Sequence, residues 1–254
     1  MFDPVFEATQ PLQSVRAEDW WAVEMELPGT KRNVLEGMAL RWECVFVYPQ
    51  DVGTLDYQAP RLAADCLASA FLSSPQEALL LDVACGTGLV AVELQRLGFC
   101  NLHGVEGSKS MLEVAKNRGL YQQLSLCVLG PEPLPAPSDH YDAVTVVGAL
   151  SDGQIPYSAV PELLRVTKPG GLLCLTTRAN SSNLPYKEAL EAQLARLEQA
   201  GKWNRVLVRT VDQWERATSE QELPPSAGSS PGFIPGAIYL YRKQEAVPAQ
   251  GTGF

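Results

Sequence analysis

The sequence predicts an α/β fold built on one mostly parallel sheet, and three observations support that prediction. Short apolar runs typical of strands alternate with segments of helical periodicity through the middle of the chain. A glycine-containing loop follows the first of these strands and opens a helix. The last two strand-like runs have no helix between them, so they are most easily antiparallel. Strands joined by crossover helices form right-handed βαβ units, which cover a parallel sheet on both faces.

The composition is that of a globular protein. A chain of 254 residues, 46% of them hydrophobic, is long enough for one large domain with a full core. The formal net charge of −9 provides no general attraction to phosphate backbones, which disfavours a nucleic-acid partner. No apolar run approaches the ~20 residues of a membrane helix, and no membrane partner is expected. We expect a monomer.

The six cysteines contain no C-x-x-C pair. Neither a metal site nor a redox motif is therefore predicted. A reduced protein is the simpler interpretation, and a cytoplasmic location is expected, with the nucleus kept open.

The expected domain spans residues 38–245. A weakly periodic segment, 1–37, precedes it and is interrupted by Pro11 and by the Pro28-Gly29 pair. We therefore expect a poorly ordered N-terminal extension. Residues 246–254 are expected to form a C-terminal tail.

Helices are predicted where apolar residues recur three or four positions apart and where glycines such as Gly98 and Gly119 stop the pattern. They are expected over residues 59–71, 89–97, 108–118, 160–171 and 184–200. In the last of them, Leu190, Leu194 and Leu197 share one face. That face is most simply packed on the sheet, and a pocket wall or a partner surface are the alternatives.

Strands are predicted at residues 78–83, 101–107, 124–130, 141–150 and 172–177. The run 141–150 is continuously apolar and is therefore expected to be buried on both faces. Two further strands, 205–214 and 236–243, follow the last helix. The segment between them, 219–235, is rich in Ser, Pro and Gly, which predicts a loop.

The stretch LLLDVACGTGLVA, residues 79–91, carries the most informative local signal in the chain. Gly86-Thr87-Gly88 follows a strand and opens a helix, where bare backbone lets a ligand approach the free N–H groups of the helix start. This context fits a nucleotide cofactor at the carboxyl edge of a parallel sheet, although a purely structural turn is the alternative. Two cofactors are open on the loop alone, a dinucleotide such as NAD and S-adenosylmethionine.

Charge separates the two cofactors. Asp82 ends the first strand, and no Lys or Arg lies between Asp82 and Leu94. A pyrophosphate on the loop would be repelled by that carboxylate, by ~4 kcal/mol at ~4 Å and an effective dielectric constant of ~20, as an upper guide. S-adenosylmethionine carries a sulfonium and an ammonium and no phosphate, so the same carboxylate would attract it. A role for Asp82 in capping or ordering the loop is the alternative.

A second acid, Glu106, follows the second strand. A carboxylate there can accept two hydrogen bonds from a ribose diol. Because both cofactors carry that ribose, Glu106 does not separate them, but it argues against the 2′-phosphate of NADP. A solvated glutamate at the end of a loop is the alternative.

Four ordered stretches resemble the successive motifs of class I S-adenosylmethionine-dependent methyltransferases: LLLDVACGTGLVA, HGVEGSKSML, YDAVTVVGAL and LLRVTKPGGLLCLTT. The likeness covers residues from about 55 to 243. It implies a Rossmann-like, seven-stranded methyltransferase fold with an antiparallel last strand, S-adenosyl-L-methionine as cofactor and S-adenosyl-L-homocysteine as product. More narrowly, DVACGTGLVAVEL and GALSDGQIP resemble a methyltransferase-like branch whose motifs do not reveal the substrate.

The resemblance implies roles for residues at the carboxyl edge. Around the methionine part of the cofactor it places Asp82, Ala84, Cys85, Gly86 and Gly88. It assigns the ribose hydroxyls to Glu106, and it places beside the ribose and adenine the residues Gly107, Ser108 and Met111. Next to the reactive methyl, at the end of the fourth strand, it places Gly148, Ala149 and Leu150.

Two departures from the family pattern stand out. Many members place an acid just after the third strand to receive the adenine amino group, and here that position is Gly130, followed by Pro131 and Glu132. Backbone carbonyls would take over that contact. Relatives also carry an aromatic F-Y-D-x-W-A element before the core, whereas this chain has LRWECVFVYPQDV, in which Trp42 and Tyr48 fill part of that role.

No residue stands out as a general base. Asp152 follows the fourth strand, where substrate should arrive, and it is the leading candidate to bind an amine or take a proton. A turn with Gly153 is its alternative role. Tyr157 and Arg178 are weaker candidates of the same kind.

The remaining reactive side chains favour structural roles. His103 begins the second strand, away from the functional edge, and His140 lies in a polar turn. Cys85 is explained by the need for a small side chain beside the loop.

The sequence therefore predicts a methyltransferase that acts on an unidentified small molecule or protein side chain. The second hypothesis is a protein that binds S-adenosylmethionine or S-adenosylhomocysteine without turnover, as a sensor or interaction module. The third is an NAD-dependent oxidoreductase. Methyl transfer is an in-line displacement, which requires positioning more than a covalent intermediate.

Overall fold

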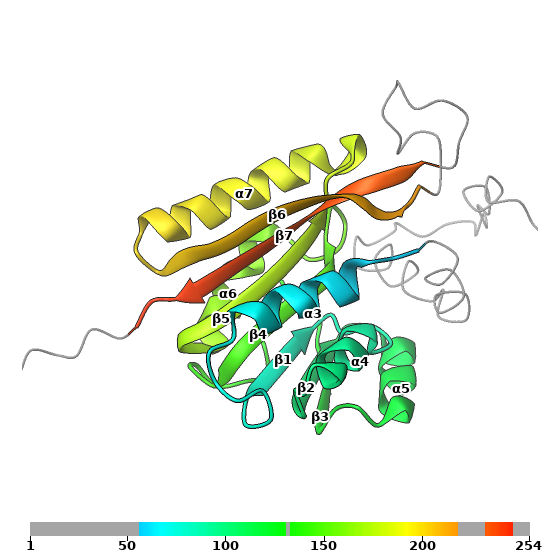
Figure 1. Ribbon diagram of the computed structural model, residues 1–254, viewed down its shortest axis with the longest axis vertical. Coiled ribbons are helices and arrows are strands. Elements are labelled where there is room, and N and C mark those ends of the chain that lie inside the picture. The colour runs from blue at the N-terminus through cyan, green and yellow to red at the C-terminus, as the bar shows by residue number, and fades with distance from the viewer. Residues whose placement is uncertain (1–55, 131–132, 218–231, 246–254) are drawn as a thin grey trace, which may run out of the picture. The chain divides into compact units, whose positions relative to one another are not determined.

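The computed structural model describes residues 56–130, 133–217 and 232–245 (Figure 1). The expected N-terminal extension, 1–37, and the expected tail, 246–254, lie outside the described residues. The same is true of the aromatic segment that contains Trp42 and Tyr48.

Seven strands form one sheet in the order β3-β2-β1-β4-β5-β7-β6. Their bounds are β1 Leu79–Val83, β2 Asn101–Glu106, β3 Gln123–Leu126, β4 Tyr141–Leu150, β5 Thr167–Arg178, β6 Trp203–Arg216 and β7 Phe233–Lys243. Strands β1 to β5 pair in parallel, whereas β7 lies between β5 and β6 and is antiparallel to both. The predicted parallel sheet and its antiparallel last strand are confirmed.

The described helices are α3 Ala59–Ala70, α4 Leu89–Arg96, α5 Lys109–Arg118, α6 Val160–Val166 and α7 Leu184–Gln199. Two short 3₁₀ turns, η2 Tyr157–Ala159 and η3 Ser181–Asn183, precede α6 and α7. In Figure 1, α3 crosses the face of the sheet over β4 and β5, with which it is in contact. Helix α4 lies in the connection from β1 to β2, α5 in that from β2 to β3, and α6 in that from β4 to β5.

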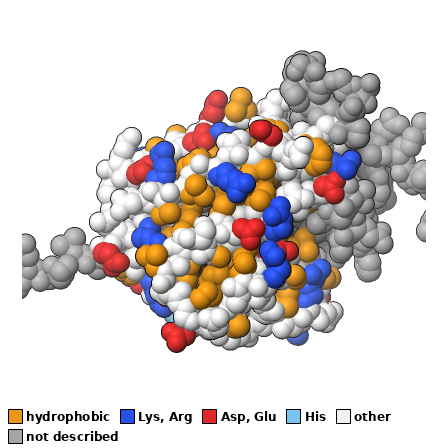
Figure 2. All heavy atoms as spheres, viewed as in Figure 1, with side chains coloured by type: hydrophobic (Ala, Val, Ile, Leu, Met, Phe, Trp, Pro, Cys, Tyr) orange, Lys and Arg blue, Asp and Glu red, His pale blue; other side chains and the backbone are white. Residues whose placement is uncertain are grey.

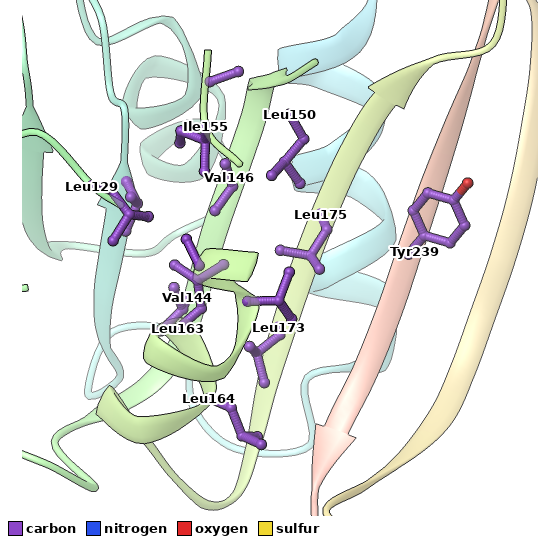
Figure 3. Close-up of a cluster of buried hydrophobic side chains, with 14 of the residues drawn as sticks. Leu129, Val144, Val146, Leu150, Ile155, Leu163, Leu164, Leu173, Leu175 and Tyr239 are labelled. Atoms are coloured by element: carbon purple, nitrogen blue, oxygen red, sulfur yellow. The ribbon is translucent and has the colours of Figure 1, made fainter. Parts of the chain in front are cut away.

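Two buried clusters cover the two faces of the sheet. Because side chains alternate along a strand, Leu80 belongs to the cluster under α3 and α4, and Leu81 to the cluster under α6 and α7. Figure 3 shows the second cluster, in which β4 and β5 side chains meet Leu163 of α6. Leu190 and Leu194 are fully buried there and Leu197 packs against them, so this face of α7 lies on the sheet.

The fourth predicted helix, 160–171, was too long. Helix α6 ends at Val166, and β5 already begins at Thr167, whose hydroxyl donates a hydrogen bond to Leu163 O at 2.8 Å. Pro169 and Gly170, the latter at φ 76°, cannot continue a helix, and they form an irregularity in the β4–β5 pairing instead.

The third strand was also predicted too long, as 124–130, whereas β3 stops at Leu126. The last two strands are paired as expected, with β6 longer than the predicted 205–214. Two tryptophan rings of β6 pack against β7. Trp203 stacks on Tyr241 with ring centroids 4.4 Å apart, and the Trp214 indole lies against the bare backbone of Gly236.

Candidate functional site

The carboxyl ends of β1 to β5 meet at one edge of the sheet, and the glycine loop lies there. Ala84, Gly86 and Gly88 all have left-handed backbone, at φ 53°, 55° and 90°. Gly88 is the N-cap of α4, and a Cβ at this position would lie 3.2 Å from the Tyr121 ring and 3.6 Å from Arg118 Cδ. The loop therefore needs glycine at Gly88 both for its conformation and for space.

Asp82 is buried beneath this loop, with 2% of its surface exposed. Its two carboxylate oxygens accept hydrogen bonds from the hydroxyls of Tyr121, at 2.7 Å, and Thr145, at 2.9 Å. Within residues 56–130, 133–217 and 232–245, no Lys or Arg forms an ion pair with it. Burial raises the pKa of Asp82 to about 7, opposed by these two hydrogen bonds and reinforced by the charge of Glu106. Among the described residues, this buried carboxylate thus has hydroxyl partners and no basic one.

Glu106 orders the glycine loop. From the sequence, this role was considered as an alternative for Asp82. Its Oε2 accepts a hydrogen bond from Gly86 N and its Oε1 from Ser108 N, both at 2.8 Å. The side chain is 1% exposed, and burial raises its pKa, while the backbone hydrogen bonds lower it. Each carboxylate oxygen has a second lone pair, so Glu106 can hold the loop and still accept from a ligand hydroxyl.

The first turn of α5 lies beside Glu106. Ser108 is the N-cap, and its hydroxyl accepts from Met111 N at 3.4 Å. Met111 Sδ lies 4.0 Å from the place where a Cβ on Gly86 would be, and a Cβ on Gly107 would touch Val128 at 3.4 Å. The structure thus brings together the predicted residues that follow β1 and β2.

The end of β4 forms the next part of the edge. Gly148 is exposed, has φ 79° and donates its N–H to Thr176 Oγ1 at 2.9 Å. Ala149 and Leu150 belong to the buried cluster under α6 and α7, so their side chains point into the core. Gly130, at φ 128°, lies after β3, where a Cβ would meet Pro156 at 3.1 Å.

Four residues near the loop were not predicted from the sequence. Tyr121 and Thr145 bind Asp82 from far along the chain, and Tyr57 lies before α3 with its hydroxyl close to Gly148. Thr87 lies inside the glycine loop. It is 1% exposed, and its hydroxyl has no hydrogen-bond partner among the described residues. Only Thr87 carried a local signal, since it lies between the two glycines.

The predicted catalytic candidates are less well enclosed. Asp152 is exposed in the turn after β4, next to Gly153 at φ 72°. Tyr157 is 43% exposed, and its ring meets that of Tyr186. Arg178 pairs with the buried Glu215, Nε to Oε1, at 2.5 Å. These contacts give structural roles to Tyr157 and Arg178.

The two histidines lie together at the other edge of the sheet. His103 Nδ1 is 3.1 Å from the hydroxyl of Tyr141, the first residue of β4, and His140 packs edge-on against the same ring. Burial, and then the neighbouring His140, lowers the pKa of His103. Cys85 is buried, and burial raises the pKa of its thiol far above the usual range, so it stays protonated. A structural role for these three side chains agrees with their surroundings.

The described part of the chain shows no group of three or more His, Cys, Asp or Glu side chains that could hold a metal ion. Among the described helices, none has the length and apolar character needed to span a membrane. No disulfide joins any two of the five described cysteines.

A family model described as a methyltransferase domain matches residues 81–175. Human methyltransferase-like protein 27 is 62% identical over 189 residues, which are 74% of this chain and 76% of the human protein. A ubiquinone/menaquinone biosynthesis C-methyltransferase from Pseudomonas putida is 32% identical over 121 residues, 44% of this chain and 46% of that protein.

Solved structures share the fold at low identity. The cyclase SpnF has a TM-score of 0.54 at 22% identity, covering 74% of this chain and 82% of that one. A putative methyltransferase from Bacillus halodurans has a TM-score of 0.52 at 17% identity, and the match covers 72% of this chain and 98% of that one. These two likenesses concern the fold, whereas the human relative and the domain match concern the family. The chain therefore belongs to the class I S-adenosylmethionine-dependent methyltransferases.

Proposed function

We propose that the chain binds S-adenosylmethionine at the glycine loop and transfers its methyl group to a small molecule or a protein side chain. The observation that carries this proposal is the pair of buried carboxylates, Asp82 and Glu106, neither of which forms an ion pair with a described Lys or Arg. A buried acid favours a cationic ligand over one that brings two phosphates.

The side chains present fit that cofactor. Asp82 would face the cationic methionine end, and the unpartnered hydroxyl of Thr87 would gain a hydrogen bond to it. Glu106 would accept hydrogen bonds from the ribose hydroxyls while it keeps the hydrogen bonds from Gly86 N and Ser108 N. Gly107, Ser108 and Met111 would line the ribose and adenine side, with Gly130 across from them.

The cofactor supplies an activated methyl group on a sulfonium. The contribution of the protein is to hold donor and acceptor in line and to exclude water, which can account for much of the rate. The exposed backbone of Gly148 at the end of β4 would border the reacting end. Asp152, in the turn that follows, would bind an amine or take a proton from the acceptor.

A second candidate is a protein that binds the cofactor without turnover. The observation that favours it is the position of the possible bases, since Asp152 is exposed and both histidines lie at the opposite edge. The fold alone does not decide the chemistry, because a solved structure with the same fold bears the name of a cyclase.

The acceptor is proposed to be neither nucleic acid nor membrane lipid, and the protein is proposed to be a cytoplasmic monomer. A net charge of −9 opposes binding to phosphate backbones. On the face drawn in Figure 2, Lys and Arg side chains are scattered among acidic and hydrophobic ones and do not form a continuous basic strip.

Two experiments test the proposal. Titration calorimetry with S-adenosylmethionine, S-adenosylhomocysteine and NAD should show binding of the first two, and tighter binding of NAD would refute it. A labelled-methyl assay over metabolite and protein extracts should then show transfer to an acceptor. Cofactor binding without any transferred label would favour the second candidate.

A further inference from the structure

The space beside the glycine loop is bordered by Tyr57, a side chain from outside the family motifs. A small cavity of about 30 Å³ lies there, with walls from the loop, from the start of α4, from Val147 and from Tyr57 and Pro60. The Tyr57 hydroxyl reaches the end of β4, so close to Gly148 that a Cβ on Gly148 would clash with it. Tyr57 therefore links the loop after β1 with the strand end after β4, the two places between which the cofactor's methionine end is proposed to lie.

The backbone around Tyr57 is anchored on both sides. Asp56 forms an ion pair with Arg216 at 2.6 Å, and Gln58 N donates to Trp214 O at 2.9 Å. The Tyr57 ring itself meets the Trp214 ring edge-on, with centroids 6.4 Å apart and an interplanar angle of 88°. Strand β6 thus holds this segment over the carboxyl edge.

These anchors limit what the ring can do. The cavity of about 30 Å³ is partly open to solvent, so a ligand that enters it meets the Tyr57 ring as one of its walls. Because Asp56 and Gln58 are held, the ring can rotate about its side-chain torsions but its backbone stays in place. Tyr57 then remains a wall of the occupied site.

We propose that Tyr57 is a specificity residue of the cofactor site, whose hydroxyl oxygen lies against the sulfonium end and favours the cationic donor over its neutral product. This rests on the proposed function, because it assumes that the methionine end lies between the loop and Gly148. An oxygen lone pair is attracted to the polarised C–H groups of a sulfonium, and this attraction is much weaker for the thioether of S-adenosylhomocysteine.

The test is the ratio of two affinities, measured by calorimetry on the full chain. Tyr57→Phe keeps the ring and removes the hydroxyl, so binding of S-adenosylmethionine should weaken about 3- to 10-fold, while binding of S-adenosylhomocysteine changes less than about 2-fold. Equal weakening of both ligands, or no change in either, would overturn the inference. Thermal unfolding of the variant without ligand establishes that it folds.

Tyr239→Phe is the matched control. It removes a buried tyrosine hydroxyl that contacts Glu191 Oε1 at 2.8 Å and faces the α6–α7 cluster, away from the loop. Its affinity ratio should equal that of the wild type, and a reduced ratio would also overturn the inference. If the wild type binds neither ligand, the proposed function fails; if it binds both and Tyr57→Phe keeps the ratio, only the role of Tyr57 fails.

Discussion

Replacing Asp82 by Asn tests the electrostatics of the site directly. Asp82 is buried and its pKa is raised from 3.8 to about 7, which corresponds to about 4 kcal/mol of unfavourable ionisation in the folded protein. Asn removes the charge and keeps the shape. Because Tyr121 and Thr145 contact the carboxylate through hydroxyls, which can donate or accept, both can also bind an amide.

The sign of the effect follows from proton binding. Between pH 4 and pH 7 the folded protein keeps the Asp82 proton and the unfolded chain does not, so the free energy of unfolding falls as pH rises through this window. Below pH 4 the two forms bind the same number of protons at this site, and above pH 7 the loss is complete. Asp82→Asn without ligand should therefore be more stable than the wild type at pH 8, by up to about 4 kcal/mol, and nearly equal to it at pH 4.

Guanidinium unfolding at several pH values measures this difference. Asp65, which pairs with Arg61 and Arg96 at the surface, provides the control variant Asp65→Asn, whose free energy of unfolding should stay within about 1 kcal/mol of the wild-type value. The same Asp82→Asn protein should bind S-adenosylmethionine at least tenfold more weakly at pH 8, since a buried carboxylate that pairs with a cation is lost. If the wild type and Asp82→Asn give parallel stability curves, Asp82 is not a strained buried acid and the electrostatic argument is wrong.

Three further predictions concern the same edge and the core. Glu106→Ala should weaken binding of S-adenosylmethionine at least tenfold by calorimetry, because it removes a charged acceptor and leaves Gly86 N unpaired; unchanged affinity would remove its ribose role. Thr87→Val should stabilise the protein without ligand by about 1 kcal/mol, since it replaces an unpartnered buried hydroxyl, and should weaken cofactor binding; a loss of stability would show that the hydroxyl is satisfied. Leu190→Ala, at a fully buried position of α7, should cost about 2–5 kcal/mol in chemical unfolding, and a cost near zero would contradict the packing of α7 on the sheet.

Much of the fold follows from local sequence signals. The alternation of apolar runs with helical periods predicted the parallel strands, and the absence of a helix between β6 and β7 predicted their antiparallel pairing. The prediction failed where tertiary pairing decides. The residues after Val166 look like the end of a helix, but the β4 edge pairs with Thr167 and begins β5 there.

The site was predictable where its residues are neighbours in sequence. Asp82 and the glycines lie within seven positions, and Glu106 follows the next strand. The contacts between them were not predictable, because they depend on strand register. Asp82 meets Thr145 since these two residues are partners across β1 and β4, and Glu106 reaches Gly86 N across the β1–β2 edge.

The insertion of β7 between β5 and β6 has a consequence for biosynthesis. Strand β6 is made first, yet it has no partner in the sheet until residues Phe233–Lys243 have left the ribosome. During that interval Trp203 lacks Tyr241 to stack on, and Trp214 lacks the Gly236 backbone that covers it. A nascent chain stalled in this interval would display an unpaired, tryptophan-bearing strand, the kind of surface that chaperones bind and that aggregates when they do not.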